Sequence, residues 1–360
     1  MKDKYYQVMG DAIARSEVLA REDAVRMLDI NQLDTMELLA LAYRFRRQYF
    51  GRTVTVHILN NVQNGMCPED CRYCAQSASS SAPIEGYAMK SDEEIYAEAA
   101  AAHAAGAGRY CLVFSGTGPS DSRIAHLVRL IREIKRRHHM EVCVSPGVVN
   151  TDQARQLKEA GLDRLNHNIN TSEKYYRYIC TSHTYADRLG TLRAAQTAGL
   201  PVCSGVIIGM GEGPDDVYGM ARTLRDAGAA SIPVNFLIPV AGIAIKAAVG
   251  LTPEYCLRVL CLFRLMNPSA EIRMAAGREL HLRSLEPLGL YAANSLFLQG
   301  YLNAKGAADN RTLRMISDMG FTLTSDIPLE ALLSRGNEDD GCTVDQLKGL
   351  KELRPFQENV

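Results

Sequence analysis

The pattern of hydrophobic and polar positions changes near Thr53. Before it, apolar residues recur at helical spacing, as in Asp23–Leu28 and Thr35–Tyr49. After it, short apolar runs end in polar or glycine-rich turns, and helical stretches follow most of them. The predicted strands are Thr53–Asn60, Arg109–Phe114, Glu141–Ser145, Arg164–Ile169, Val202–Ile208, Ile232–Leu237, Glu271–Met274 and Asn294–Leu298.

The stretches between these strands carry signals for helix ends. Several end at glycine, which tolerates the left-handed conformation of a helix C-cap. Asp92, Thr151 and Thr252 stand where N-caps are expected. About eight strand–helix units in one run favour an α/β fold of the (β/α)8 TIM-barrel type. A doubly wound sheet is the alternative, because periodicity alone does not decide whether a sheet closes.

Three parts of the chain follow from this pattern. Residues 1–52 are predicted to form an N-terminal helical extension, and residues 53–325 the barrel. Residues 326–360 are predicted to form a charged, peripheral C-terminal tail with a helix at Val344–Leu353. With 360 residues, the chain is long enough to bury a sizeable core.

Charge and composition narrow the class of partner. The 40 basic and 41 acidic side chains nearly cancel, which favours a small-molecule partner over nucleic acid or a membrane surface. No apolar run approaches the roughly 20 residues of a membrane helix, and the N-terminus lacks the apolar segment of a signal peptide. We therefore expect a cytoplasmic protein, in which the ten cysteines are metal ligands or packing residues rather than disulfides.

Cys67, Cys71 and Cys74 form a CxxxCxxC motif directly after the first predicted strand. Three thiolates this close can bind three irons of a [4Fe–4S] cluster and leave the fourth iron open. An open iron can bind S-adenosylmethionine and pass the electron that cleaves it to a 5′-deoxyadenosyl radical. A structural zinc or redox loop is the alternative, but no fourth cysteine stands nearby. The spacing, with Tyr73 before the last cysteine, resembles the radical S-adenosylmethionine superfamily.

A second set of cysteines lies within predicted strands: Cys111, Cys143 and Cys203. Strand residues alternate in the direction they face, so each can point into the barrel, as can Arg273 on a later strand. Singly, each cysteine is more often a buried packing residue. Together with an arginine that needs partners when buried, they favour an internal metal cluster.

The chain resembles the biotin synthase family over about Thr53–Leu323. The shared segments, in order, are Cys67-Pro-Glu-Asp-Cys-Arg-Tyr-Cys-Ala-Gln-Ser77, Tyr110-Cys111, Glu141-Val-Cys143, Asn166-His-Asn168, Val202-Cys-Ser-Gly205, Pro233-Val-Asn235 and Arg273-Met-Ala-Ala-Gly-Arg-Glu279. The resemblance implies that Cys111, Cys143, Cys203 and Arg273 hold an auxiliary cluster, [2Fe–2S] or larger, whose sulfide is consumed. It also implies that Tyr73, Asn170, Arg188, Gly209 and Glu212 contact S-adenosylmethionine, and that Asn168, Asn235 and Asn303 lie near the substrate.

The implied reaction inserts sulfur between two unactivated carbons of dethiobiotin, through hydrogen abstraction by the radical. The implied partners are a flavodoxin or ferredoxin as electron donor and the iron–sulfur assembly machinery, and a homodimer is suggested. Without the resemblance, Asn168 and Asn235 would be interpreted as strand polar groups bonded to backbone and Arg188 as an exposed helix charge. His167 is interpreted as a core imidazole rather than a general base.

The chain departs from the family pattern at several positions. Asn170 stands where the family usually has Asp, which removes a charged acceptor. Asn303-Ala304 replaces an expected Thr-Thr pair, with Lys305 as a candidate replacement donor, and LVFSGTGPS follows Cys111. Cys180 is an additional cysteine that either packs or joins the auxiliary site; Cys256 and Cys261 are predicted to pack, and Cys342 to be a surface thiol.

Two other functions stay open at this level. One is another radical S-adenosylmethionine enzyme on the same barrel, of the maturase or mutase type, which has no need of all the strand cysteines and Arg273. The other is a non-catalytic iron–sulfur electron carrier, which tolerates a cluster with cysteine on every iron.

Overall fold

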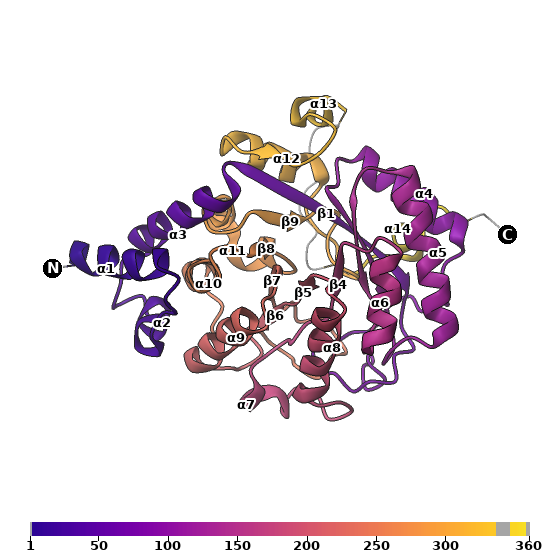
Figure 1. The fold of residues 1–360 in the computed structure, drawn as a ribbon, viewed down its shortest axis with the longest axis horizontal. Coiled ribbons are helices and arrows are strands. Elements are labelled where there is room, and N and C mark those ends of the chain that lie inside the picture. Colours follow the sequence, from indigo (N-terminus) through magenta and orange to yellow (C-terminus); the bar gives the residue numbers. More distant parts are fainter. Residues whose placement is uncertain (1, 336–345, 358–360) are drawn as a thin grey trace.

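A parallel β-barrel forms the centre of the computed structural model, which describes residues 2–335 and 346–357 (Figure 1). β1 pairs with both β2 and β9, so the sheet closes and the doubly wound alternative is excluded. β5 and β6 both pair with β7 and share one of eight strand positions. The barrel strands are β1 (Thr53–Gln63), β2 (Arg109–Phe114), β3 (Glu141–Ser145), β4 (Arg164–Asn166), β5 (Val202–Cys203), β6 (Val206–Ile208), β7 (Ser231–Phe236), β8 (Glu271–Met274) and β9 (Ser295–Phe297).

The predicted barrel and all eight of its strand positions are therefore confirmed. The one interruption, between β5 and β6, falls at Ser204 and Gly205. A Cβ atom added at Gly205 would lie 2.3 Å from the carbonyl oxygen of Pro233, so only glycine fits beside β7 there. The backbone N–H of Gly205 donates to Asn168 Oδ1 (2.9 Å). This bond links the break to the segment that follows the C-terminal end of β4.

Helices surround the barrel, and most bury one face. In α5, for example, Ile124, Leu127, Ile131 and Ile134 are fully buried at helical spacing. By contrast, α10 is buried on all sides from Cys256 to Met266. The surrounding helices are α4 (Asp92–Ala104), α5 (Asp121–Arg137), α6 (Thr151–Glu159), α7 (Glu173–Tyr176), α8 (Tyr185–Thr197), α9 (Pro214–Asp226), α10 (Pro253–Met266), α11 (Arg278–Leu282), the 3₁₀ helix η1 (Arg283–Tyr291) and α12 (Asp309–Asp318).

The N-terminal residues form the predicted helical extension, seen beside the barrel in Figure 1. It consists of α1 (Lys2–Ala14), α2 (Arg21–Leu28) and α3 (Thr35–Phe50), and α3 packs against α10. Arg258 of α10 is buried and donates to the carbonyl oxygens of Met27 (2.9 Å) and Leu33. These bonds attach the extension to the barrel, because a buried guanidinium must find acceptors.

The C-terminal tail contains α13 (Leu329–Leu333) and α14 (Leu350–Leu353), after the short strand β10 (Thr322–Leu323). The predicted helix at 344–353 is confirmed only from Leu350, and its first two residues lie outside the described ones. The tail is also not peripheral throughout. The N–H of Lys348 donates to Asn303 O (2.8 Å), and Lys305 N–H donates to Gln346 O (2.9 Å), so this segment crosses the C-terminal end of the barrel.

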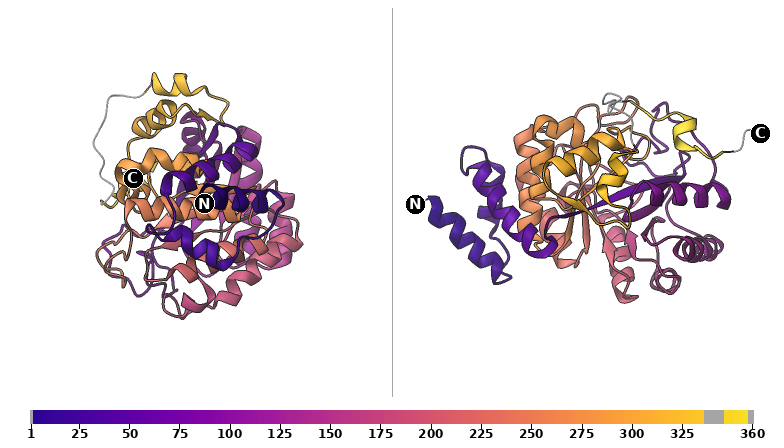
Figure 2. Two further views of the ribbon diagram at one scale, coloured as in Figure 1. Left: turned by 90° about the vertical axis from the view of Figure 1, so that its left-hand side faces the viewer. Right: turned by 90° about the horizontal axis from the view of Figure 1, so that it is seen from above.

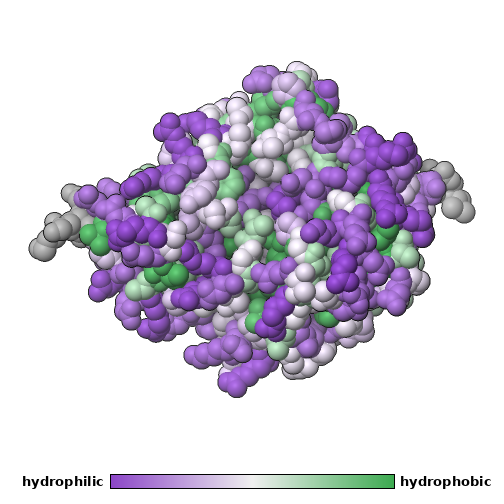
Figure 3. Space-filling view, viewed as in Figure 1, coloured by the Kyte–Doolittle hydropathy of each residue, from purple (hydrophilic) through white to green (hydrophobic). Residues whose placement is uncertain are grey.

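The first and last described helices, α1 and α14, lie on opposite sides of the molecule, as the right-hand view of Figure 2 shows. The face drawn in Figure 3 is largely hydrophilic, with hydrophobic side chains in small separate patches. Across the described part of the chain, every helix is too short or too polar to cross a bilayer.

Candidate active site

One cavity, of about 290 Å³, gathers most of the predicted site residues at the C-terminal ends of the strands. This is the end at which barrel enzymes carry their active sites. All three cysteines of the CxxxCxxC loop line the cavity. So do Tyr73, Asn168, Asn170, Arg188, Asn235 and Asn303.

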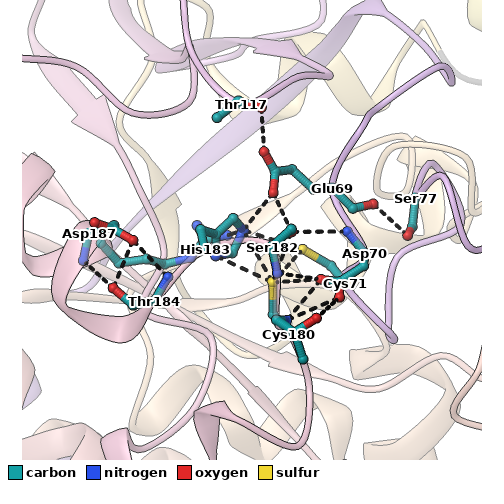
Figure 4. Close-up of polar contacts among 12 residues, drawn as sticks. Glu69, Asp70, Cys71, Ser77, Thr117, Cys180, Ser182, His183, Thr184 and Asp187 are labelled. Atoms are coloured by element: carbon teal, nitrogen blue, oxygen red, sulfur yellow. Dashed lines mark hydrogen bonds and ion pairs between the residues drawn. The ribbon is translucent and has the colours of Figure 1, made fainter.

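Hydrogen bonds clamp the CxxxCxxC loop against the loop between α7 and α8 (Figure 4). Asp70 Oδ1 accepts from the backbone N–H groups of Thr181 (2.9 Å) and Ser182 (3.0 Å). Glu69 accepts from the hydroxyls of Ser182 and Thr117. The two acidic residues between the first and second cysteines therefore fix the loop, and sequence reasoning assigned them no role.

Cys180 lies beside the first motif and not among the barrel cysteines. Its Sγ atom is 3.8 Å from Cys71 Sγ, and both residues are buried. The suggestion that Cys180 joins the auxiliary site is therefore wrong. Cys256 and Cys261 are fully buried on α10 and pack as predicted, whereas Cys342 lies outside the described residues.

Tyr73, Asn170 and Arg188 form one wall of the cavity. Asn170 Nδ2 donates to Tyr73 Oη (2.6 Å). Asn170 has a φ of 67°, a left-handed conformation that Asn and Asp adopt more readily than other residues with a side chain. Arg188 donates to Asn168 O (3.1 Å) and Tyr176 Oη (2.6 Å), so it is held in the site and is not an exposed helix charge.

The three asparagines assigned to the substrate region are hydrogen-bonded within the protein. Asn168 Oδ1 accepts from Gly205 N–H, and the Asn235 amide bonds to the backbone of Val206 and Ala276. Asn303 exchanges two side-chain hydrogen bonds with Asn64. Their positions on the cavity wall are therefore fixed by the fold.

Two residues predicted to contact S-adenosylmethionine, Gly209 and Glu212, do not line this cavity in the described part of the chain. The carboxylate of Glu212 instead accepts from the N–H groups of Gly209 (2.6 Å) and Met210 (2.9 Å), and so shapes its own turn. Lys305 is paired with Glu352 of α14 (3.1 Å) and does not reach the cavity as a replacement donor.

The strand cysteines form a layer directly below the cavity, that is, nearer the N-terminal ends of the strands. Cys111, Cys143 and Cys203 are buried together with Phe297. Val113 and Ser145, two residues further along β2 and β3, line the cavity floor, because residues two apart on a strand face the same way. A hydrogen bond from Cys143, followed by the charge of Arg273, lowers the pKa of Cys203 to about 5, while hydrogen bonds with Cys111 and Cys203 raise the pKa of Cys143.

Arg273 belongs to this layer, and residues at the N-terminal ends of the strands hold its guanidinium in place. Its Nη1 lies 3.9 Å from Cys203 Sγ, while Nη2 donates to Glu271 (2.6 Å) and Ser231 (2.8 Å). Glu271 also accepts from Arg109 (2.9 Å). Burial alone would raise the pKa of Glu271, but Arg109, His57 and Arg273 hold it well below its usual range.

We call Arg109, Glu141, Ser231, Glu271 and Ser295 the barrel floor, because they are the first residues of β2, β3, β7, β8 and β9. Hydrogen bonds connect them across the N-terminal end of the barrel. Arg273 Nε is buried without a hydrogen-bond partner in the described part of the chain. An unpaired buried donor beside three thiols is what an anionic group in this layer would satisfy.

Several cavity residues were missed by sequence reasoning. Gln76, Thr117, His183, Tyr301 and Leu347 line the cavity. Only Gln76 carried a signal, because it lies within the segment that resembles the biotin synthase family. The others come from loops or the tail, whose positions depend on tertiary structure.

Family profiles match nearly the whole barrel. The Radical SAM superfamily matches residues 63–224, and the Biotin and Thiamin Synthesis associated domain matches residues 233–322. With the closed barrel and the three-cysteine loop at its C-terminal end, these matches define a radical S-adenosylmethionine enzyme.

Relatives identify the family within this class. The biotin synthase of Magnetococcus marinus is 52% identical over 313 residues, covering 87% of this chain and 98% of that protein. The biotin synthase of Acaryochloris marina is 49% identical, covering 88% of this chain and 92% of that protein. The chain belongs to the biotin synthase family.

Solved structures share the fold at low identity. Methylornithine synthase has a TM-score of 0.75 at 20% identity and covers 90% of this chain and all of its own. The FeFe-hydrogenase maturase of Carboxydothermus hydrogenoformans has a TM-score of 0.74 at 16% identity, covering 92% of this chain and 82% of its own. These similarities support the barrel and carry no information about substrate.

The residues fit the groups that the family implies, a [4Fe–4S] cluster with S-adenosylmethionine and an auxiliary iron–sulfur cluster. Three cysteines face the cavity beside Tyr73, Asn170 and Arg188. Three further thiols lie beneath it with an arginine whose Nε is unpaired. Both sets offer the sulfur ligands that iron–sulfur clusters take.

Proposed function

We propose that this enzyme converts dethiobiotin to biotin by inserting sulfur between two saturated carbons. One observation carries the proposal: the layer of Cys111, Cys143, Cys203 and Arg273 lies directly below a cavity lined by Cys67, Cys71 and Cys74. A substrate in the cavity would lie between the two sets of ligands. Holding reactive groups at such short range replaces a bimolecular encounter with a positioned step.

One group of cavity residues suits S-adenosylmethionine. Cys67, Cys71 and Cys74 are assigned to the first cluster, and Tyr73, Asn170 and Arg188 to the bound S-adenosylmethionine. Arg188 is oriented by Tyr176, and Asn170 by Tyr73, so both groups are positioned before any ligand arrives. When bound, the first cluster and S-adenosylmethionine supply a carbon radical, and the auxiliary cluster supplies sulfur.

A second group of cavity residues suits the substrate. Asn168, Asn235 and Asn303 are assigned to polar groups of dethiobiotin, and the amides of Asn235 and Asn303 are already bonded to the protein. Phe236 and Leu237 offer apolar surface for the aliphatic part. A mostly apolar wall with a few fixed polar groups is typical of small-molecule sites.

Arg273 and the barrel floor are assigned to the auxiliary cluster. Glu271 holds the Arg273 guanidinium at the level of the three thiols, and Arg109 in turn holds Glu271. This arrangement supports Arg273 as a fourth ligand of the auxiliary cluster. The barrel floor fixes the guanidinium through hydrogen bonds from Nη2 to Ser231 and Glu271.

An anaerobic assay tests the proposal. The reconstituted enzyme is mixed with S-adenosylmethionine, a reductant and dethiobiotin, and biotin and 5′-deoxyadenosine are quantified by mass spectrometry. We expect both products, with biotin limited by the amount of auxiliary cluster. In Cys143→Ala we expect 5′-deoxyadenosine without biotin. Deoxyadenosine without biotin in the unmodified enzyme would contradict the assigned substrate.

Consumption of the auxiliary sulfide requires a source that replaces it, and cleavage of S-adenosylmethionine requires an electron. We propose that an iron–sulfur assembly system restores the sulfide, that a flavodoxin or ferredoxin supplies electrons, and that the enzyme acts as a homodimer in the cytoplasm. Size measurement in solution and reconstitution with each electron donor test these assignments.

A further inference from the structure

Cys71, Cys180 and His183 form a cluster that the proposed reaction leaves unexplained (Figure 4). Cys71 belongs to the CxxxCxxC loop, and the other two residues come from the loop between α7 and α8. The two cysteines are buried, and the His183 side chain is 10% exposed. The loop clamp through Asp70 and Glu69 holds these three ligand atoms together.

The distances between the three ligand atoms match a single tetrahedral metal ion. The Sγ atoms of Cys71 and Cys180 are 3.8 Å apart, and they lie 3.6 Å and 3.5 Å from His183 Nε2. Metal–sulfur bonds of about 2.3 Å and metal–nitrogen bonds of about 2.0–2.1 Å place two sulfurs about 3.8 Å apart and a sulfur and a nitrogen about 3.6 Å apart. Ligands on different irons of a cubane lie much farther apart.

The hydrogen bonds of His183 also suit a metal ligand. Nδ1 lies 2.8 Å from Tyr176 Oη, and Nε2 accepts from Arg188 (3.1 Å). Since Arg188 only donates, Nε2 carries the lone pair that a metal requires. A ring whose other nitrogen is held by a hydrogen bond is the usual state of a metal-binding histidine. A bound ion would replace Arg188 at Nε2.

We propose that Cys71, Cys180 and His183 bind one Zn²⁺ ion in the chain before cluster assembly. Two thiolates and an imidazole are ligands that zinc prefers, and water completes the tetrahedron. Two thiolates neutralise the charge of the ion. Because Cys71 is common to both sites, Zn²⁺ and the [4Fe–4S] cluster exclude each other. That last step rests on the proposed assignment of Cys71 to the cluster.

Cobalt(II) is the probe for the site itself. In the full-length, cluster-free Cys67→Ala/Cys74→Ala chain, Co²⁺ should give tetrahedral thiolate–cobalt absorption that Zn²⁺ abolishes. Removal of an outer partner of a metal site costs about 10–100-fold in affinity, so removing a ligand by Cys180→Ala or His183→Ala should cost at least as much. Cys261→Ala, a buried cysteine of α10, should leave the absorption unchanged. Equal absorption in all variants would overturn the proposal.

Exclusion is tested by order of addition. One equivalent of Zn²⁺ given to the cluster-free native chain should lower the iron incorporated on later reconstitution, and Cys180→Ala should restore it. Equal inhibition in both chains would overturn the exclusion. Thermal unfolding of each metal-free variant, matching its parent, shows that folding is intact. Normal biotin formation with no cobalt site would remove only this inference and leave the proposed function standing.

Discussion

The carboxylate of Glu271 joins the barrel floor to the cysteine layer. Arg109, Arg273 and His57 all lie within 3.1 Å of its oxygens. A buried charge pair is stable only while each partner is compensated. Glu271 therefore determines both the stability of the floor and the position of Arg273.

Glu271→Gln keeps the shape but removes the charge. We expect a loss of about 3 kcal/mol in the free energy of unfolding, because Arg109 and Arg273 would remain buried with reduced compensation. Urea unfolding of the cluster-free protein measures it. Glu17→Gln, which breaks an exposed pair with Arg15, is the control and should leave stability nearly unchanged, because solvent screens an exposed pair. Equal losses in the two variants would contradict this role of Glu271.

Asn170→Asp restores the residue type that the family usually carries. Asp also tolerates the left-handed backbone at this position, so the fold should be unaffected. A carboxylate accepts a stronger hydrogen bond from a ribose hydroxyl than an amide does, so we expect about fivefold tighter binding of S-adenosylmethionine. Calorimetric titration of the cluster-loaded enzyme measures it. Unchanged affinity would place Asn170 away from the bound ligand.

At the scale of elements, the break between β5 and β6 brings the backbone of Gly205 to Asn168 and Pro233. Gly205→Ala should cost about 1–3 kcal/mol, since the added methyl group overlaps Pro233 O. Gly190→Ala on α8 is the matched control, where nothing lies within 4 Å and stability should rise by up to about 1 kcal/mol. Thermal unfolding compares them. A neutral Gly205→Ala would show that β6 can shift without cost.

Elements built from local signals were the most predictable part. The strand from Arg109 to Phe114 was predicted to the residue, because its apolar run is short and clearly bounded. Helix starts were less certain: Thr252 caps α10 as predicted, whereas Ser91 and Asn150 cap α4 and α6 in place of their neighbours Asp92 and Thr151. Adjacent residues with similar side chains compete for one cap, and the backbone decides between them.

The candidate site was predictable where it follows strand periodicity and motif spacing. Period-two alternation placed Cys111 and Cys143 inside the barrel, and the structure brings them together. The neighbours of Cys180 could not be predicted, because they depend on how the loop between α7 and α8 folds onto another loop. The same holds for Leu347, which reaches the cavity only because the tail crosses the barrel end.

At the scale of the whole molecule, the C-terminal tail connects the C-terminal end of the barrel to helix α4 on the outside of the barrel. Leu347 lines the cavity, Lys348 N–H bonds to Asn303 O, and Leu353 is buried. Further out, Arg354 pairs with Glu94 of α4 (2.7 Å). The tail therefore supports the part of the cavity wall that contains Asn303, which we assign to the substrate.

A stop after residue 345 removes this support. We expect the barrel to stay folded by circular dichroism and the KM for dethiobiotin to rise about tenfold, which corresponds to roughly 1.4 kcal/mol of lost contacts. Arg354→Ala, which removes only the outer ion pair, should change KM little. An unaltered KM after truncation would mean that the tail plays no part in substrate binding.

The barrel floor has a consequence for the order of events in catalysis. Arg109, Glu271, Ser231 and Ser295 are buried and interconnected at the N-terminal end, so within the described residues they close that end and the cysteine layer lies open toward the cavity above it. In the reaction we propose, the same opening would admit dethiobiotin, release biotin and admit the iron and sulfide that restore the auxiliary cluster. Repair and turnover therefore compete for one entrance, and a molecule of product that is slow to leave delays the enzyme's own renewal.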